Sequence, residues 1–223
     1  MIDIFVGRHP EDIRLLKLRY TKQKEALGET NQSLSAKVYG MGSSTELRLA
    51  MKICTEGSRP DSTHPVDTEL VIRDVQEIKV HMSNAFPNYE VLFNILLRRS
   101  DSHIFQIAMY YEMQVGEHLD KAFRENPNLS KTARKILVHA VRTAQHLTYR
   151  DVMLLRDALG QDSISGATKN ERLAIRVCRM HWYPQHWRQI KAEFVGLAGK
   201  DLIERLNNRE GLLGDLLVAM AQV

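Results

Sequence analysis

Two stretches of the chain carry the same series of residues 83 positions apart. In each stretch a histidine is followed by an aliphatic residue, an aromatic residue, a glycine and a leucine at the same spacing. The matched pairs are His103 and His186, Ile107 and Ile190, Tyr111 and Phe194, Gly116 and Gly199, and Leu119 and Leu202. A repeat of this length indicates that the chain is built from copies of one folding unit that pack on each other.

The spacing of apolar residues within the repeat predicts helices. Residues 92–99 and 104–111 each place apolar side chains three and four positions apart, which is the period of a helix with one buried face. The sequence between them offers Ser100 or Ser102 as a helix cap, and Gly116 is expected to end the second helix. Alternating patterns typical of strands are short, so the sequence predicts an all-α protein.

The repeat also suggests how the chain is divided. A similar order of helices is expected after residue 167, and the first 82 residues fit a third copy at an offset of 91. An insertion around residues 22–31 separates this copy from the other two. We therefore expect three units, the first one incomplete and followed by a linker, with these bounds: residues 1–64, 65–147 and 148–223.

Composition narrows the class of protein further. With 43% apolar and 26% charged residues, the chain is suited to a globular fold, and its apolar runs reach only about half of the roughly 20 residues that a membrane-spanning helix needs. Cys54 and Cys178 lack metal-type spacing and are expected to be reduced thiols, which suits the cytoplasm. The net charge of +4 favours anionic partners, with lipid head groups, RNA and acidic proteins all open.

The repeated residues resemble the annexin repeat. In that family an arginine is followed by His or Gln, an aliphatic residue, Tyr, Gly and Leu, and this chain keeps that order without a gap in its central unit. The matching residues are Arg99, His103, Ile107, Tyr111, Gly116 and Leu119. The last unit has Trp182 in place of the arginine, and the segments that begin at Asp74 and Asp151 are similar to the family's first helix. The resemblance covers nearly the whole chain, as the second to fourth of the usual four repeats, with the first one incomplete.

The resemblance implies annexin-like five-helix repeats packed into a curved disc, here two full repeats and one partial. It also implies calcium-dependent binding to phospholipid membranes at the convex face. In the family, backbone carbonyl groups of a Gly-x-Gly-Thr loop and a later carboxylate hold calcium, and lipid phosphate completes the coordination. Calcium prefers six to eight oxygen ligands, so both the loop and the carboxylate matter.

This chain departs from that pattern at the expected calcium sites. The loop after Met82 reads Ser-Asn-Ala-Phe-Pro, and Asn128 stands where the carboxylate is expected, so we expect this site to be inactive. A residual calcium site remains possible at Gly166, Thr168 and Glu210. The cofactor is therefore calcium at this site, or none.

Membrane affinity without calcium requires other residues. Lys131, Arg134 and Lys135 lie at helical spacing and are candidates for contact with lipid phosphate, and Phe86 at a loop tip is a candidate wedge. The alternative is that the basic residues form an ordinary solvated helix face and that Phe86 folds back.

The remaining motifs favour structure over chemistry. His103 and His186 recur at one repeat position, which indicates an interhelical contact, and the Trp182–Trp187 cluster is expected to pack or to meet a partner. The sequence contains no phosphate loop, nucleophile elbow or HExxH motif, so an enzyme is not predicted, and no motif indicates specific nucleic-acid binding.

Two functions are consistent with these residues. The first is an annexin-like module that binds phospholipid membranes peripherally from the cytoplasm, or acts as a scaffold there, with calcium-dependent binding weakened or lost. The alternative is a helical protein-interaction scaffold that binds no lipid. A protein partner or a dimer is possible because the incomplete first repeat should expose an apolar surface.

Overall fold

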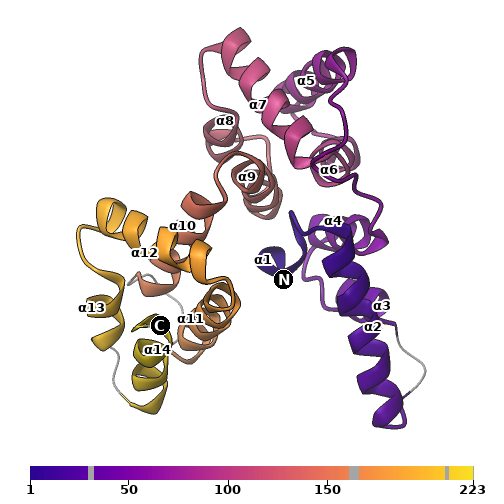
Figure 1. Ribbon diagram of the computed structural model, residues 1–223. Helices are drawn as coiled ribbons and strands as arrows, with labels where there is room; N and C mark the ends of the chain where they lie inside the picture. The colour runs from indigo at the N-terminus through magenta and orange to yellow at the C-terminus, as the bar shows by residue number, and fades with distance from the viewer. Residues whose placement is uncertain (30–32, 161–165, 209–210, 223) are drawn as a thin grey trace. The chain divides into compact units, whose positions relative to one another are not determined.

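The computed structural model describes residues 1–29, 33–160, 166–208 and 211–222. The described residues form fourteen helices and no β-strand (Figure 1), so the expected all-α class is confirmed. The chain divides into two compact units, Met1–Gln145 and His146–Val223. The number of repeats stays a prediction.

The first unit contains nine of the described helices. They are α1 (Ile2–Phe5), α2 (Pro10–Ala26), α3 (Leu34–Gly40), α4 (Thr45–Glu56), α5 (Thr68–Ser83), α6 (Tyr89–Arg98), α7 (Asp101–Val115), α8 (Leu119–Glu125) and α9 (Lys131–Gln145). Helix α9 lies at the centre of this unit, since α4, α6, α7 and α8 all pack against it.

Local sequence signals set the bounds of α7. Of the two serines expected to cap it, Ser100 is the N-cap, and its hydroxyl oxygen accepts a hydrogen bond from the His103 amide at 3.2 Å. Gly116 ends the helix with a φ angle of 76°, a left-handed conformation that costs glycine little and other residues more. Both expected signals are confirmed.

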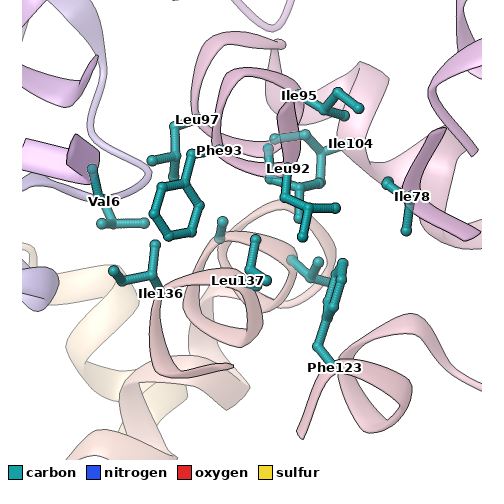
Figure 2. Packing of buried hydrophobic residues seen from close by; sticks show 14 of the residues in the cluster. Val6, Ile78, Leu92, Phe93, Ile95, Leu97, Ile104, Phe123, Ile136 and Leu137 are labelled. Atoms are coloured by element: carbon teal, nitrogen blue, oxygen red, sulfur yellow. The ribbon is translucent and has the colours of Figure 1, made fainter. Parts of the chain in front are cut away.

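Apolar side chains from several helices fill the core of the first unit. Figure 2 shows Leu92 and Phe93 of α6 pointing toward Ile136 and Leu137 of α9, with Ile104 of α7 close by. All five side chains are fully buried. Because neither helix could bury such a stripe alone, this packing is what stabilises helices of only 10 and 15 residues.

The second unit contains five described helices. They are α10 (Leu147–Leu159), α11 (Gly166–His181), α12 (Pro184–Ala198), α13 (Leu202–Asn207) and α14 (Leu212–Gln222). Helix α12 packs on α10 and α11 and buries Trp187, Ile190 and Phe194. These residues are 83 positions after Ile104, Ile107 and Tyr111, the buried face of α7, so the sequence repeat is also a repeat of packing.

The start of the chain differs from the other copies. Helix α1 is only four residues long, and α2 begins at Pro10 with His9 as its N-cap. Helix α2 then runs through residues 22–26, the start of the expected insertion, because Lys, Gln, Glu and Ala are all strong helix formers. None of the described helices is both long and apolar enough to cross a bilayer.

Candidate functional site

The carboxylate of Asp74 joins helix α5 to the start of α7. Arg99 donates to it from Nε at 2.7 Å and from Nη2 at 3.1 Å. The Nε2 atom of His103 lies 3.0 Å from the same carboxylate, and it carries a proton because an ionised carboxylate only accepts hydrogen bonds. Burial raises the pKa of Asp74, but the hydrogen bonds from His103 and Arg99 outweigh burial and hold this pKa below its ordinary value. Asp74 is therefore a charged structural contact.

Asp151 makes the matching contact in the second unit. The Nε2 atom of His186 lies 2.9 Å from its carboxylate. Trp182 stands where the repeat arginine is missing, and guanidinium groups come from two other positions instead, Arg150 at 2.6 Å and Arg179 at 3.2 Å. Burial again raises the pKa of Asp151, and the contacts with His186, Arg150 and Arg179 lower it further than burial raises it.

These two contacts account for both repeated histidines. Each histidine joins a helix of its unit to a buried aspartate on another helix, as the interhelical hypothesis predicts. In the described part of the chain the two aspartates are bound by histidine and arginine side chains, so the arrangement is a structural contact between helices. The described residues also contain no group of three or more His, Cys, Asp or Glu side chains that could hold a metal ion.

The loop between α5 and α6 is fixed at its first end by asparagine side chains. The backbone carbonyl of Met82 accepts a hydrogen bond from Nδ2 of Asn126 at 2.9 Å and a longer one from Nδ2 of Asn128 at 3.4 Å. The Oδ1 atom of Asn126 in turn accepts from the Asn128 amide at 2.8 Å. The segment between α8 and α9 therefore lies against the start of this loop.

A second contact fixes the other end of the same loop. The hydroxyl oxygen of Tyr89, the first residue of α6, accepts a hydrogen bond from the Ser130 amide at 2.9 Å. Because Ser130 immediately precedes α9, the loop from residue 83 to 88 lies beside the N-terminus of α9. This brings Phe86 and Lys131, two of the predicted lipid-binding residues, to neighbouring segments.

The predicted lipid-binding side chains are largely open to solvent. Phe86 is 93% exposed, so it does not fold back under its own helix. Lys131 and Lys135 are exposed and Arg134 is half-buried. We call Lys131, Arg134 and Lys135 the basic face.

The basic face forms no ion pair with a carboxylate in the described part of the chain. Arg134 instead donates to the backbone carbonyl of Arg124 at 3.3 Å. Arg142 differs, because it is bound to Asp120 at 2.8 Å. Lys131, Arg134 and Lys135 are therefore not neutralised by an ion pair, although the Glu46 carboxylate hydrogen-bonds Ser130, the residue before Lys131.

This donor set does not fit calcium. A calcium ion takes six to eight oxygen ligands and usually at least one carboxylate. Here the side chain at the carboxylate position is the neutral Asn128, and both Asn126 and Asn128 direct N–H groups at the loop carbonyl of Met82. The Met82 carbonyl oxygen is thus already engaged by hydrogen-bond donors.

The structure does not test the residual calcium site that is predicted at the second loop. Gly166 and Thr168 lie in the first turn of α11, and the structure describes their backbone but not their side chains. Glu210 lies outside the described residues. This site stays a prediction.

The aromatic cluster of the second unit separates into two parts. Trp187 lies on α12 and is buried in the core of the second unit, with 1% of its surface exposed. Trp182 and Tyr183 are 74% and 56% exposed. Packing therefore explains Trp187 and leaves Trp182 and Tyr183 on the surface.

Comparison with solved structures defines the class of protein that this fold represents. The structure of a mutant of annexin A8 with an intact N-terminus matches 99% of this chain with a TM-score of 0.82, at 19% sequence identity. Calcium-bound annexin (Sm)1 matches all of it with a TM-score of 0.76, at 15% identity. The chain covers 65% and 63% of those two proteins. It therefore has the annexin fold along its whole length.

Sequence comparison supports the same family. Annexin A11 of Mus musculus is 32% identical to this chain over 123 residues, which are 55% of this chain and 23% of annexin A11. Annexin A11 of Oryctolagus cuniculus gives the same identity over 124 residues. No family model matches the chain. The resemblance to annexins is thus confirmed by fold over the whole chain and by sequence over about half of it. The sequence match spans less than a quarter of the length of these curated relatives.

Sequence reasoning missed two features of these sites. It did not assign a role to Asn126, and it did not identify Arg150 and Arg179 as the partners of Asp151. A signal for the first was present, since Asn-Pro-Asn at residues 126–128 is typical of a turn in which an asparagine side chain bonds the backbone two residues on. For the second, Arg150 directly precedes Asp151 in the sequence, whereas Arg179 reaches it only because α11 packs on α10.

Proposed function

We propose that this chain is an annexin-like module that binds the surface of anionic phospholipid membranes peripherally, or acts as a scaffold there. The contact consists of Phe86 and the basic face. In this proposal calcium-dependent binding is weakened or lost, the chain has no catalytic role, and it acts from the cytoplasm.

The exposure of Phe86, on a segment next to basic residues that form no ion pair with any described carboxylate, carries the proposal. A large aromatic side chain that is 93% exposed at a loop tip stabilises nothing within its own unit, but it gains about 2 kcal/mol if an apolar phase buries it. Each basic residue near an anionic bilayer adds on the order of 1 kcal/mol. The sum supports weak attachment that salt would screen.

The amide contacts at Met82 support the reduced role of calcium. They take up the loop carbonyl where a calcium ion would need oxygen, and no carboxylate is present at position 128. Gly166, Thr168 and Glu210 remain in the proposal as a weak residual calcium site.

Co-sedimentation with phosphatidylserine vesicles tests the proposal, with and without millimolar calcium, at low and at physiological salt. Salt-sensitive binding without calcium is the expected result. Binding only with calcium would contradict the reduced role of calcium and direct attention to Gly166, Thr168 and Glu210. A lack of binding under every condition would overturn the membrane function itself.

One observation favours the alternative of a protein-interaction scaffold. Helix α2 leaves Leu15, Leu16 and Leu18 exposed by 43%, 36% and 43%, although Leu16 corresponds to Ile107, which is fully buried in α7. An apolar helix face of this kind is suited to contact with another protein. If the chain self-associates with rising concentration and L15S together with L18S abolishes this, while no vesicle binding is seen, the scaffold is the better description.

A further inference from the structure

The start of the Phe86 loop is held by hydrogen bonds from two asparagine side chains. Two side-chain amides from the segment before α9 reach one backbone carbonyl at the end of α5. The Met82 side chain is itself buried, so the contact is anchored on the core on one side. We call the side chains of Asn126 and Asn128, with the Met82 carbonyl, the amide latch.

The orientation of Asn126 is defined by its own contacts. Its Oδ1 atom accepts from the Asn128 amide at 2.8 Å, which leaves Nδ2 to face the Met82 carbonyl at 2.9 Å. The reverse orientation would place two oxygens against each other and two N–H groups together. A single orientation therefore satisfies every group, and it presents a donor to the loop.

The latch occupies a carbonyl oxygen that would otherwise be open to a cation. A carbonyl oxygen has two lone pairs, and at Met82 both asparagine donors point at it. Since the neutral amide of Asn128 stands where a carboxylate is expected, the electrostatic attraction that calcium needs is also absent.

We propose that the amide latch replaces the calcium ion at this loop, so that Phe86 is held in its exposed, membrane-facing position with no cation bound. Asn126 and Asn128 are then positioning residues that act through the loop. This inference rests on the proposed function only for the use of Phe86 at membranes. The order of the loop is a property of the free protein.

The variant N126D isolates the latch. Aspartate keeps the oxygen that accepts from the Asn128 amide and replaces the N–H group that reaches Met82 with a negatively charged oxygen. The neutral variant N126A removes the donor without adding charge. Q106E, on the exposed surface of α7, is the matched control that adds the same charge as N126D elsewhere.

Backbone ¹⁵N relaxation in the free protein gives the first readout. In the unaltered chain we expect residues 84–86 to have order parameters near the rigid value of about 0.85. In N126D and N126A we expect the order parameters of these residues to fall toward about 0.6. We also expect millimolar calcium to leave the Met82–Tyr89 resonances unchanged. An ordered loop in both variants, or calcium-induced shifts at these resonances in the unaltered chain, would overturn the inference. Thermal unfolding of each variant confirms that the bundle is intact.

Vesicle binding gives the second readout. With phosphatidylserine vesicles and no calcium, N126D and N126A should both bind about fivefold more weakly, as expected when one hydrogen bond that orders the loop is lost. A loss in N126D and Q106E but not in N126A would show that charge alone is responsible, and would also overturn the inference. If the unaltered chain does not bind vesicles, the proposed function fails, while the relaxation data still decide whether the latch exists.

Discussion

The Nε2 atom of His103 lies 3.0 Å from the carboxylate of Asp74, and this contact is repeated in the second unit by His186 and Asp151 at 2.9 Å. In both units a buried aspartate on one helix accepts a hydrogen bond from a histidine on another helix. Each unit therefore has its own ionic contact as well as its own apolar core. Each ionic contact can be tested separately from the membrane site.

Removal of the Asp74 carboxylate should destabilise the first unit. D74A leaves Arg99 and His103 without their partner, and the loss of one member of a buried pair costs about 3 kcal/mol, less than the largest values because Arg99 is partly exposed. Urea unfolding measures this change. E204A, which breaks the exposed pair with Lys200, is the control and should cost less than about 0.5 kcal/mol. Equal effects of the two variants would contradict a structural role for Asp74.

Stability should fall in acid because of Asp74 and Asp151. The folded chain holds the pKa of both carboxyls below the ordinary value of 3.8, so the unfolded chain binds protons more readily. Their contribution is fully present above about pH 5 and is lost as the pH falls through 3.8 toward the lowered pKa values. Urea unfolding between about pH 6 and pH 3 measures this slope. D74N and D151N should each make it shallower, whereas D215N on the exposed side of α14 should not.

Replacement of Phe86 should weaken membrane binding and leave the fold unchanged. F86S removes an apolar side chain that is 93% exposed, so the free energy of unfolding should shift by less than about 0.5 kcal/mol. Partial insertion of this ring into a bilayer predicts about tenfold weaker binding to phosphatidylserine vesicles. F105S, at a partly exposed phenylalanine of α7, is the matched control. Unchanged vesicle binding in F86S would remove Phe86 from the proposed contact.

Neutralisation of the basic face should act mainly at low salt. K131A and K135A should each weaken vesicle binding about fivefold at low ionic strength, with a smaller effect at physiological salt. K200A removes an exposed lysine that is paired with Glu204 and serves as the control. If all three variants behave alike, the attraction comes from the overall charge of the chain and not from the basic face.

The two tryptophans of the second unit should respond in opposite ways. W187A empties a fully buried site and should cost about 3 to 5 kcal/mol. W182A alters a side chain that is 74% exposed and should change stability by less than about 0.5 kcal/mol. Urea unfolding distinguishes them. A large cost for W182A would mean that the surface around Trp182 is packed by a group outside the described contacts.

Much of the fold could be predicted because its signals are local or periodic. The cap at Ser100, the stop at Gly116 and the stripe of Ile104, Ile107 and Tyr111 are each defined by a few neighbouring residues. A repeated pattern then predicts a repeated bundle. The short α1 broke this pattern because only four of its residues are helical before the chain turns toward Pro10.

The site was less predictable because its contacts join distant segments. Phe86 and the basic face were identified by residue type and spacing, and the structure brings their segments together through Ser130 and Tyr89. The contact from Asn126 to Met82 spans 44 positions and requires the loops to meet in space. The same holds for Arg179, which lies 28 positions after Asp151.

The hydrogen bonds between Asn126, Asn128 and Met82 have a consequence for when such a loop acts. A metal-held loop reports a second messenger, because it gains and loses its ion as the cell signals. A loop held by covalently attached amides has no such input and is in the same state at rest and during a signal. Its timing would be set by the lipid, through the appearance or removal of anionic head groups on a particular bilayer.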